Sequence, residues 1–309
     1  MKLGMIGLGR MGGNMSERLR QAEHEVVGYD RDPKVSQAAD LADLVKQLGD
    51  TPRVVWVMVP SGQPTDDTIL ELRDLLGPGD VVIDGGNSNW RDSQRHGEEL
   101  AAAGIGFIDA GTSGGVWGLQ EGYCLMVGGA PEHVALVQPI FDALAPVDGF
   151  AHVGPVGAGH FTKMVHNGIE YGIMQSYAEG YELLTAVDIE VDAQAAIKAW
   201  QHGSVVRSWL LDLLVLALED QESFQKFKGY ASDSGEGRWT VNEAVRLAVP
   251  LPVITAALFA RFASRQEESP AMQVISALRS QFGGHSEQAI ERRPAESVAG
   301  PDEGKVVPG

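Results

Sequence analysis

One segment of the chain carries polar side chains at the spacing of a helix face. In "HFTKMVHNGIEYG", residues 160–172, these side chains are Lys163, His166, Asn167, Glu170 and Tyr171. Their i, i+3, i+4, i+7, i+8 spacing usually marks the apolar stripe with which a helix packs on its domain. A cation, an imidazole, an amide, a carboxylate and a phenol on one stripe are typical of a site for a polar substrate. The alternative is a solvated helix surface.

The lysine and the glutamate of this segment suit proton transfer. A lysine sheltered from water loses its proton more readily and can then act as a general base. A glutamate shielded from water can hold a proton and return it. We therefore expect Lys163 and Glu170 to be catalytic and the polar stripe to face a cleft. An apolar face of the same helix should anchor it in its domain through Phe161, Met164, Val165, Ile169, Ile173 and Met174.

The elements around this helix follow two different patterns. Before it, apolar runs alternate with helix-like segments at about 11–22, 34–48, 65–76 and 91–103. The runs are "KLGMIGL", "EVVGYD", "RVVWVMV", "DVVIDGG", "GFIDAGT" and "YCLMVGG". Strands that are apolar on both faces and alternate with helices predict an α/β fold with a doubly wound, mainly parallel sheet of the Rossmann type. From about residue 158 to 282 only helical patterns follow, which predicts an all-α C-terminal domain.

A glycine loop follows the first predicted strand. In "GMIGLGRMG", Gly7, Gly9 and Gly12 have the G-x-G-x-x-G spacing between a strand and a helix. The first glycine permits a tight turn, the second lets backbone approach a pyrophosphate, and the third lets helix and strand pack closely. In this context the motif predicts a dinucleotide site at the helix N-terminus. We expect it to comprise Gly7, Leu8, Gly9, Arg10, Met11, Gly12, Asp30, Arg31, Val59, Pro60 and Asn87.

Asp30 ends the second predicted strand, where a carboxylate can accept hydrogen bonds from ribose hydroxyls. A carboxylate at this place also repels a 2′-phosphate, which favours NAD over NADP. Arg31 comes next, and its guanidinium could stack on adenine, attract a 2′-phosphate or remain a solvated charge. NAD is therefore the expected cofactor, and NADP is the alternative.

Two further loops should lie at the same edge of the sheet, because ligands of open parallel sheets bind beyond the carboxyl ends of the strands. "DVVIDGGNSNW" offers Asn87, and "FIDAGTSGGVWGLQEG" offers Ser113, Gly114 and Gly115. Glycines let backbone N–H groups reach a ligand, while Asn87 and Ser113 add neutral hydrogen bonds. The alternative is a pair of ordinary turns.

The composition disfavours several classes of partner. The chain has 309 residues and a formal net charge of −18, which argues against nucleic acid and anionic membrane surfaces. With one cysteine, Cys124, and no histidine cluster at zinc spacing, we expect no disulfide and no metal site. The start lacks the apolar region of a signal peptide, and no apolar run is long enough to span a bilayer. These features favour a cytoplasmic protein.

The alternation of predicted strands and helices ends at "VGPVGAG", which we take as the domain boundary. Residues 1–155 are expected to form the dinucleotide-binding domain. Residues 156–285 are expected to form an all-helical domain for substrate binding and oligomerisation. Residues 286–309 are rich in proline, glycine and charge and predict a flexible tail.

Taken in order, these motifs resemble the decarboxylating 6-phosphogluconate dehydrogenase family in its short form. "GLGRMG", "IDGGNS", "GTSGG", "HFTKMVHNGIEYG", "GEGRWT" and "FAR" occur in the family's order, and "RSQFGGH" is similar to its terminal segment. The resemblance covers nearly the whole chain. It implies a homo-oligomer, a dimer or a tetramer, that oxidises 6-phosphogluconate at C3, releases CO2 and yields ribulose 5-phosphate and reduced cofactor.

The resemblance also implies a role for each polar residue. Lys163 matches the general base that takes the C3 hydroxyl proton, and Glu170 matches the acid that protonates C1. The sugar contacts match Asn87, Ser113, Gly114, Gly115, His166 and Asn167. The phosphate contacts match Tyr171, Arg238, Thr240 and Arg261, with Arg279 and His285 matching residues supplied by a neighbouring subunit. Two positions depart from the common NADP-type forms of the family: Asp30-Arg31 replaces Asn-Arg, and Arg238 replaces lysine.

Two rival interpretations remain open at this stage. A β-hydroxyacid dehydrogenase acting on a small unphosphorylated substrate would share the glycine loop, the SGG loop and the helix lysine. The "HNGIEYG" continuation and the cations Arg238, Arg261 and Arg279 argue against it. A non-catalytic dinucleotide-binding protein on the same fold is the second rival, since a fold does not fix a function. It predicts that Lys163 and Glu170 are dispensable.

Overall fold

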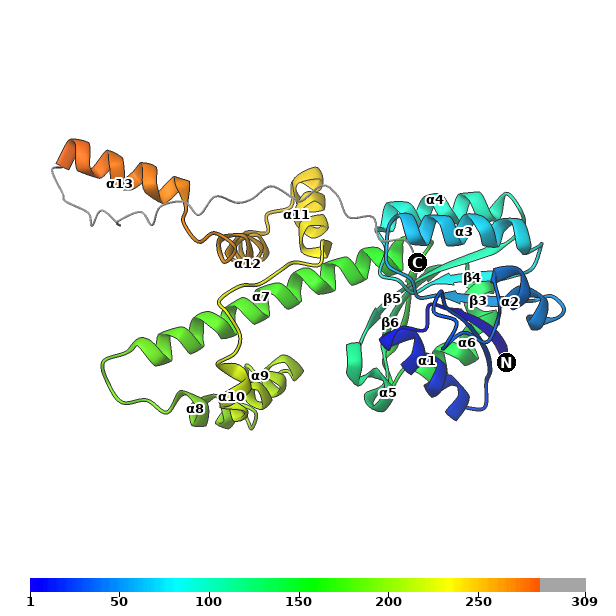
Figure 1. Ribbon diagram of the computed structural model, residues 1–309, viewed down its shortest axis with the longest axis horizontal. Helices are drawn as coiled ribbons and strands as arrows, with labels where there is room; N and C mark the ends of the chain where they lie inside the picture. Colours follow the sequence, from blue (N-terminus) through cyan, green and yellow to red (C-terminus); the bar gives the residue numbers. More distant parts are fainter. Residues whose placement is uncertain (284–309) are drawn as a thin grey trace, which may run out of the picture.

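A twisted sheet organises the first part of the computed structural model, which describes residues 1–283 (Figure 1). Within these residues the sheet has seven strands in the order β2-β1-β3-β4-β5-β6-β7. Strands β1 to β5 are parallel, β6 is antiparallel to β5, and β7 is parallel to β6. The predicted α/β fold with a mainly parallel sheet is confirmed. The strands are β1 Lys2–Ile6, β2 Glu25–Tyr29, β3 Val54–Val57, β4 Val81–Asp84, β5 Gly106–Ser113, β6 Cys124–Gly129 and β7 Phe150–Gly154.

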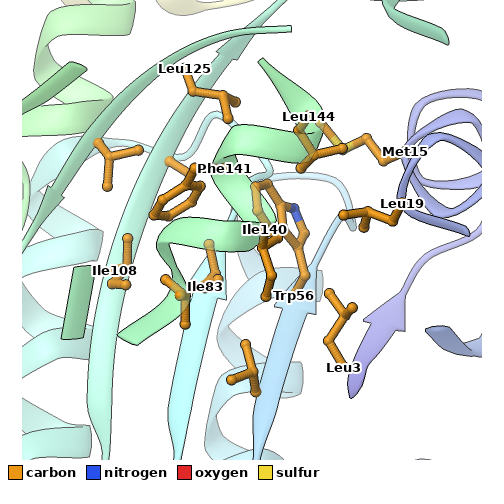
Figure 2. Close-up of a cluster of buried hydrophobic side chains, with 14 of the residues drawn as sticks. Leu3, Met15, Leu19, Trp56, Ile83, Ile108, Leu125, Ile140, Phe141 and Leu144 are labelled. Atoms are coloured by element: carbon orange, nitrogen blue, oxygen red, sulfur yellow. The ribbon is translucent and has the colours of Figure 1, made fainter. Parts of the chain in front are cut away.

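Helices cover both faces of the sheet, and each layer has its own apolar core. The helices are α1 Arg10–Gln21, α2 Leu41–Leu48, α3 Gln63–Leu75, α4 Trp90–Ala101, α5 Gly118–Glu121 and α6 Pro131–Leu144, with a 3₁₀ turn η1 at Gly115–Trp117. Helices α1 and α6 pack on one face and α2, α3 and α4 on the other. In the first core the Trp56 ring meets Phe141 edge to face, at 6.0 Å between centroids (Figure 2). Such aromatic pairs add about 1 kcal/mol beyond their buried area.

The structure corrects two local predictions. The segment predicted as a helix over 34–48 is helical only from Leu41, because Ser36 and Gln37 bond the end of β2 instead. The Gln37 side-chain oxygen accepts from the Gly28 N–H at 2.8 Å, and Asp40 then caps the shorter helix. Strand β7 has no counterpart among the predicted strands. It is an edge strand whose central residues 151–153 are exposed, so it lacks the apolar run that identifies a buried strand.

Beyond the sheet the described chain is helical, which confirms the predicted all-α second part. Helix α7, Ala158–Ala186, leaves the sheet and carries the other helices along its length (Figure 1). On its far half lie α8 Ala193–Ala199, α9 Trp209–Glu219 and α10 Gln221–Phe224. On its near half lie α11 Glu236–Leu247 and α12 Pro252–Ala263, and α13 Pro270–Gly283 extends away from α12.

Glycines allow the first turn of α7 to lie directly on β5 and β6. A methyl group on Gly159 would lie 2.3 Å from the Asp109 carbonyl oxygen and 2.6 Å from that of Met126. A methyl group on Gly111 of β5 would lie 2.5 Å from the Lys163 Cβ atom. The backbones therefore approach more closely than any other residue type permits. This contact fixes the distance between Lys163 and the sheet.

We predict that Gly159→Ala destabilises the fold by about 3 kcal/mol, because the methyl group must push α7 off the sheet. Gly180 is the matched control, since it lies in the same helix and a methyl group there meets nothing within 4 Å. Gly180→Ala should stabilise the protein by about 0.5–1 kcal/mol. Urea unfolding midpoints measure both changes. Equal midpoints for the two variants would contradict the proposed close contact.

Candidate active site

The glycine loop borders a cavity of about 520 Å³ at the carboxyl ends of β1 and β3. Gly7 has a φ of +89°, which favours glycine, and a methyl group on Gly12 would lie 1.9 Å from the Gly7 carbonyl oxygen. A methyl group on Gly9 would meet nothing within 4 Å, so the backbone there is open to a ligand. The three glycines thus satisfy the three requirements of a dinucleotide loop. Of the predicted cofactor residues, the cavity is lined by Gly7, Gly9, Arg10, Met11, Gly12, Asp30, Arg31, Val59, Pro60 and Asn87.

Asp30 holds the loop and faces the same cavity. Its carboxylate accepts hydrogen bonds from the Leu8 N–H at 2.7 Å and from the Asp32 N–H at 2.9 Å. Leu8 is not among the lining residues, so its backbone contributes by orienting Asp30. Each carboxylate oxygen keeps further acceptor capacity for hydroxyl groups. Arg31 lines the cavity on an exposed turn beside it.

A larger cleft of about 900 Å³ lies between the sheet edge and the helical part. One wall carries the predicted loop residues Asn87, Ser113, Gly114 and Gly115, and α7 carries Lys163, His166, Asn167 and Glu170. The structure therefore brings both loops and the helix stripe to one site. Asn87 and Met11 line both cavities, which places the cofactor cavity next to the cleft. The Asn87 amide is fixed by Thr112, accepting from its N–H at 2.9 Å and donating to its carbonyl oxygen at 3.0 Å.

Helix α9 supplies a wall of the cleft that the sequence did not predict. This wall consists of Ser208, Trp209, Leu210 and Leu213. These residues lie far from the motifs along the chain, and nothing in their types marks a site. They reach the cleft only because α9 folds back beside α7.

Lys163 is buried, and its side-chain nitrogen contacts the oxygen of an amide rather than a carboxylate. Its side-chain Nζ donates to the Asn167 Oδ1 atom at 2.6 Å and lies 3.4 Å from the His166 Nδ1 atom. The residue is only 5% exposed. Burial lowers the pKa of Lys163, and the charges of Glu236 and Glu170 oppose that effect. Burial, followed by the Lys163 charge, likewise lowers the pKa of His166. Both groups are therefore biased towards their neutral, proton-accepting forms.

Glu236 is a buried carboxylate near Lys163 that was not among the predicted site residues. It begins α11, whose first turn crosses α7: Gly237 packs on the Tyr171 ring, and the Thr240 hydroxyl donates to the Met164 carbonyl oxygen at 2.8 Å. Burial raises the pKa of Glu236, while Lys163, His160 and a hydrogen bond from Asn167 oppose the rise. Its position in "GEGRWT" gave no signal, because only the crossing of two helices brings it near Lys163.

Glu170 lies further out along the stripe. Its side chain is 35% exposed, and its Oε2 atom is 4.0 Å from the His166 Nδ1 atom. The carboxylate can therefore reach a ligand in the cleft and exchange protons with water. Glu170 lies one turn beyond His166, and its partly exposed environment differs from the buried environment of Lys163.

The predicted apolar anchoring face of α7 is partly wrong. Met164 is buried and Phe161 packs edge to face on Trp90, but Ile169 is 51% exposed and Ile173 is 36% exposed. Together with Val165, these two isoleucines line the cleft. The buried side of α7 instead uses Gly159, Gly168 and Gly172, because close helix contacts need small residues rather than large ones.

Tyr171 does not line the cleft, so the predicted polar stripe divides into two. Eight residues after Lys163, the helix has turned by about 80°, which carries Tyr171 towards α11 and α12. Its hydroxyl accepts from the Ser234 N–H at 3.0 Å, and the Arg261 guanidinium lies 3.5 Å above its ring. The side chain of Arg238 lies nearby on α11 and is bonded to Asp233. Tyr171, Arg238 and Arg261 thus form a second polar group on the other flank of α7.

Three other residues are predicted to contact the phosphate, and the two described ones lie outside this polar group. The Thr240 hydroxyl is buried and also donates towards the Glu236 carbonyl oxygen at 2.9 Å. Arg279 is exposed on α13 and is not among the residues that line the cleft. His285 lies outside the described residues, as does the predicted tail 286–309. Their roles stay predictions.

Asp109 ties the start of α7 to the sheet, and it was not among the predicted site residues. Its carboxylate oxygens accept from the Gly157 N–H at 2.7 Å and from the His160 N–H at 2.8 Å. The His160 ring bonds the Ser93 hydroxyl of α4 at 2.7 Å. Burial raises the pKa of Asp109 to about 6, against the opposing effects of His160 and the two backbone donors. A carboxylate at a helix N-terminus is favoured by the helix dipole.

Among residues 1–283, no helix is both long and apolar enough to cross a membrane. Within the same range, no group of three or more His, Cys, Asp or Glu side chains is placed to hold a metal ion.

Comparisons with known proteins match both parts of the chain. The NAD-binding domain of 6-phosphogluconate dehydrogenase matches residues 2–157, and the C-terminal domain of 6-phosphogluconate dehydrogenase matches residues 159–298. An NAD-dependent, decarboxylating 6-phosphogluconate dehydrogenase of Haloferax volcanii is 42% identical over 92% of this chain and 98% of its own length. A decarboxylating 6-phosphogluconate dehydrogenase of Lactococcus lactis is 38% identical over 94% of this chain and 67% of its own.

A solved structure extends the similarity to three dimensions. Plasmodium falciparum 6-phosphogluconate dehydrogenase, determined in apo form and with NADP+ or 6-phosphogluconate, superposes with a TM-score of 0.80 at 25% identity. The match covers 95% of this chain and 67% of the Plasmodium chain. With the glycine loop, the SGG loop and the lysine helix assembled at one edge of the sheet, the chain belongs to the 6-phosphogluconate dehydrogenase family.

Proposed function

We propose that this protein oxidises and decarboxylates 6-phosphogluconate to ribulose 5-phosphate and CO2, with NAD as the preferred hydride acceptor. One observation carries the proposal: a buried lysine with a lowered pKa lies in a cleft that adjoins a dinucleotide cavity. The family match and the NAD-dependent relative support the same reaction. Bound NAD would accept the hydride from C3, and the residues around Gly9 and Asp30 would hold it.

Lys163 would serve as the base and then as the electrostatic stabiliser. Its neutral amine takes the C3 hydroxyl proton as the C3–H bond gives up its hydride. The resulting 3-keto acid loses CO2 when the C1–C2 bond breaks, and the electron pair forms an enolate at the C3 oxygen. The protonated Lys163 donates a hydrogen bond to that oxygen. Asn167 holds the lysine nitrogen by the 2.6 Å hydrogen bond to its side-chain oxygen.

Glu170 would complete the reaction by protonating the former C2 carbon, which becomes C1 of the product. Its half-exposed carboxyl group lies on the cleft side of α7 and can regain a proton from water. His166, Asn87 and Ser113 would orient the sugar hydroxyls from opposite walls of the cleft. The arginines on the flank of α7 would bind the phosphate, since guanidinium groups match its oxygens bidentately.

We also propose that the working form is a homo-oligomer in the cytoplasm. Helix α13 extends away from the other helices (Figure 1). Four of its apolar side chains are between 46% and 59% exposed: Met272, Val274, Ile275 and Leu278. Contiguous exposed apolar surface of this kind marks an interface. A second copy that covers this helix would also bring Arg279 towards a neighbouring chain, as the family resemblance implies.

We predict that the protein turns over 6-phosphogluconate with NAD and releases CO2, and that Lys163→Met lowers kcat at least about 1000-fold by removing the base. Cofactor affinity should stay within about twofold, because Lys163 is absent from the glycine-loop cavity. Lys198→Met is the control, since that exposed lysine pairs with Glu219. Initial rates and CO2 release decide the matter. A higher kcat/KM with NADP would overturn the NAD preference, and turnover of 3-hydroxyisobutyrate alone would favour the β-hydroxyacid rival.

The pH profile should report the charge of Glu236. Its carboxylate favours the protonated form of Lys163, so Glu236→Gln should lower the pKa of that lysine further. The acidic limb of the kcat/KM profile, where the base must be neutral, then moves to lower pH by about 1 unit. Glu243→Gln, on the same helix but paired with Arg91 and Arg246, should leave the limb in place. A shift to higher pH, or an equal shift in both variants, would refute this electrostatic role.

We predict that light scattering finds at least twice the mass of a single chain at micromolar concentration. Ile275→Glu should raise the monomer fraction about tenfold or more, because it places a charge in the apolar face of α13. Gln273→Glu adds the same charge at an exposed polar position of that helix and serves as the control. A monomeric wild-type protein would contradict the proposed oligomer.

A further inference from the structure

Three guanidinium groups gather around the loop at 231–234, on the flank of α7 that carries Tyr171 and packs against α11 and α12. Arg238 comes from α11, Arg261 from α12, and Arg265 from the turn after α12. Arg261 donates to the Ser232 carbonyl oxygen at 3.0 Å, and Arg265 donates to the Ala231 carbonyl oxygen at 3.2 Å. Arg238 and Arg261 are predicted site residues, whereas Arg265 is not.

Asp233 joins two of these arginines through one carboxylate. Its Oδ2 accepts from the Arg238 Nε at 2.6 Å and its Oδ1 from the Arg238 Nη2 at 3.2 Å. Its Oδ1 also pairs with the Arg265 Nη2 atom. The Asp233 side chain is 4% exposed, and the hydrogen bond from Arg238 is the main reason why its pKa lies well below the usual range. The carboxylate is therefore a fixed anion inside the cluster.

The geometry leaves the outer edge of Arg238 available. The Nε and Nη2 atoms face Asp233, so the Nη1 atom and the remaining Nη2 hydrogen point away from it. The Arg238 side chain is 51% exposed and lies 4.5 Å above the Phe262 ring, which holds the guanidinium plane. Arg265 lies 5.5 Å from the same ring. Two cations on one ring repel each other, and the carboxylate between them offsets that repulsion.

Arg265 changes the charge that Arg238 presents. Arg238 paired with Asp233 alone would be a neutral couple, with little attraction for an anion. With Arg265 sharing the Oδ1 atom of Asp233 with Arg238, and Arg261 beside them, three positive charges face one negative charge. This local excess of positive charge stands in a chain whose formal net charge is −18. A dianionic phosphate is the ligand class that such a cluster favours.

This inference rests on the proposed function. We propose that Arg265 is a specificity-determining residue, which acts through Asp233 to position Arg238 for the phosphate of the substrate. Arginine needs this brace where a lysine would not, because a planar fork binds phosphate only in the correct orientation. Arg265 and Asp233 are positioning residues, and Arg238 is the group that contacts the phosphate.

The test compares Arg265→Gln with the wild-type full-length protein. We expect the KM for 6-phosphogluconate to rise about tenfold while kcat changes less than about threefold, because a charge-assisted contact to phosphate is weakened. The inhibition constant of inorganic phosphate, as a competitor of the substrate, should rise by a similar factor. The dissociation constant for NAD should stay unchanged. A structural defect would instead lower kcat and weaken NAD binding together.

Arg246→Gln is the matched control, because Arg246 also pairs with a largely buried acid, Glu243, outside this cluster. It should leave the KM within about twofold. In an Asp233→Asn background the effect of Arg265→Gln should shrink below about threefold, since the brace is already lost. An undiminished effect would show direct phosphate contact and overturn the positioning role, as would an unchanged KM in the single variant. Failure of the wild-type protein to use 6-phosphogluconate would refute the proposed function instead.

Discussion

The contact between the first turn of α7 and strands β5 and β6 is the constraint on which the site depends. Glycines at positions 111 and 159 let the backbones of α7 and the sheet approach closely. The Asp109 carboxylate accepts hydrogen bonds from two backbone N–H groups at the start of the helix. Lys163 lies one turn further on, so its position relative to the loops of the sheet is set by this packing. The helix is 29 residues long and carries the other helices of the second part, which therefore take their positions from the same contact.

The close packing of α7 on the sheet buries two ionisable side chains, and burial shifts the pKa of each. Asp109 and Lys163 are both buried, and burial raises the pKa of the acid while it lowers the pKa of the base. The carboxylate is compensated by backbone donors at a helix N-terminus. The lysine is compensated by the oxygen of an amide, which stabilises an ammonium less than a carboxylate would. The same packing that fixes the lysine thus also helps it to become a base.

The features that could be predicted from sequence are those in which one segment contains the whole pattern. The strand, glycine loop and helix around Gly9 lie within a few residues of each other, and the α/β alternation follows from local apolar runs. Glu236 and the α9 wall could not be predicted, because α11 and α9 must pack on α7 before Glu236 comes near Lys163 and α9 lines the cleft. The spacing along α7 correctly placed Lys163, His166, Asn167 and Glu170 on one cleft, but it wrongly assigned Ile169 and Ile173 to the buried face. Periodicity shows that two faces differ, and it does not show which face meets glycine-mediated contacts and which meets a cleft.

The partner of each basic side chain decides whether that side chain stays charged or can accept a proton. Arg53 pairs with Asp80, Arg91 with Glu243, and Arg238 with Asp233, and hydrogen bonds from these arginines help to hold the pKa of each acid low. Such pairs keep both groups ionised throughout the neutral range. Lys163 lies among carboxylates too, since Glu170 and Glu236 influence it, but neither forms an ion pair with it within 4.0 Å among the described residues. Burial, with an amide rather than an acid at its nitrogen, therefore biases Lys163 towards its neutral form even in this acidic chain.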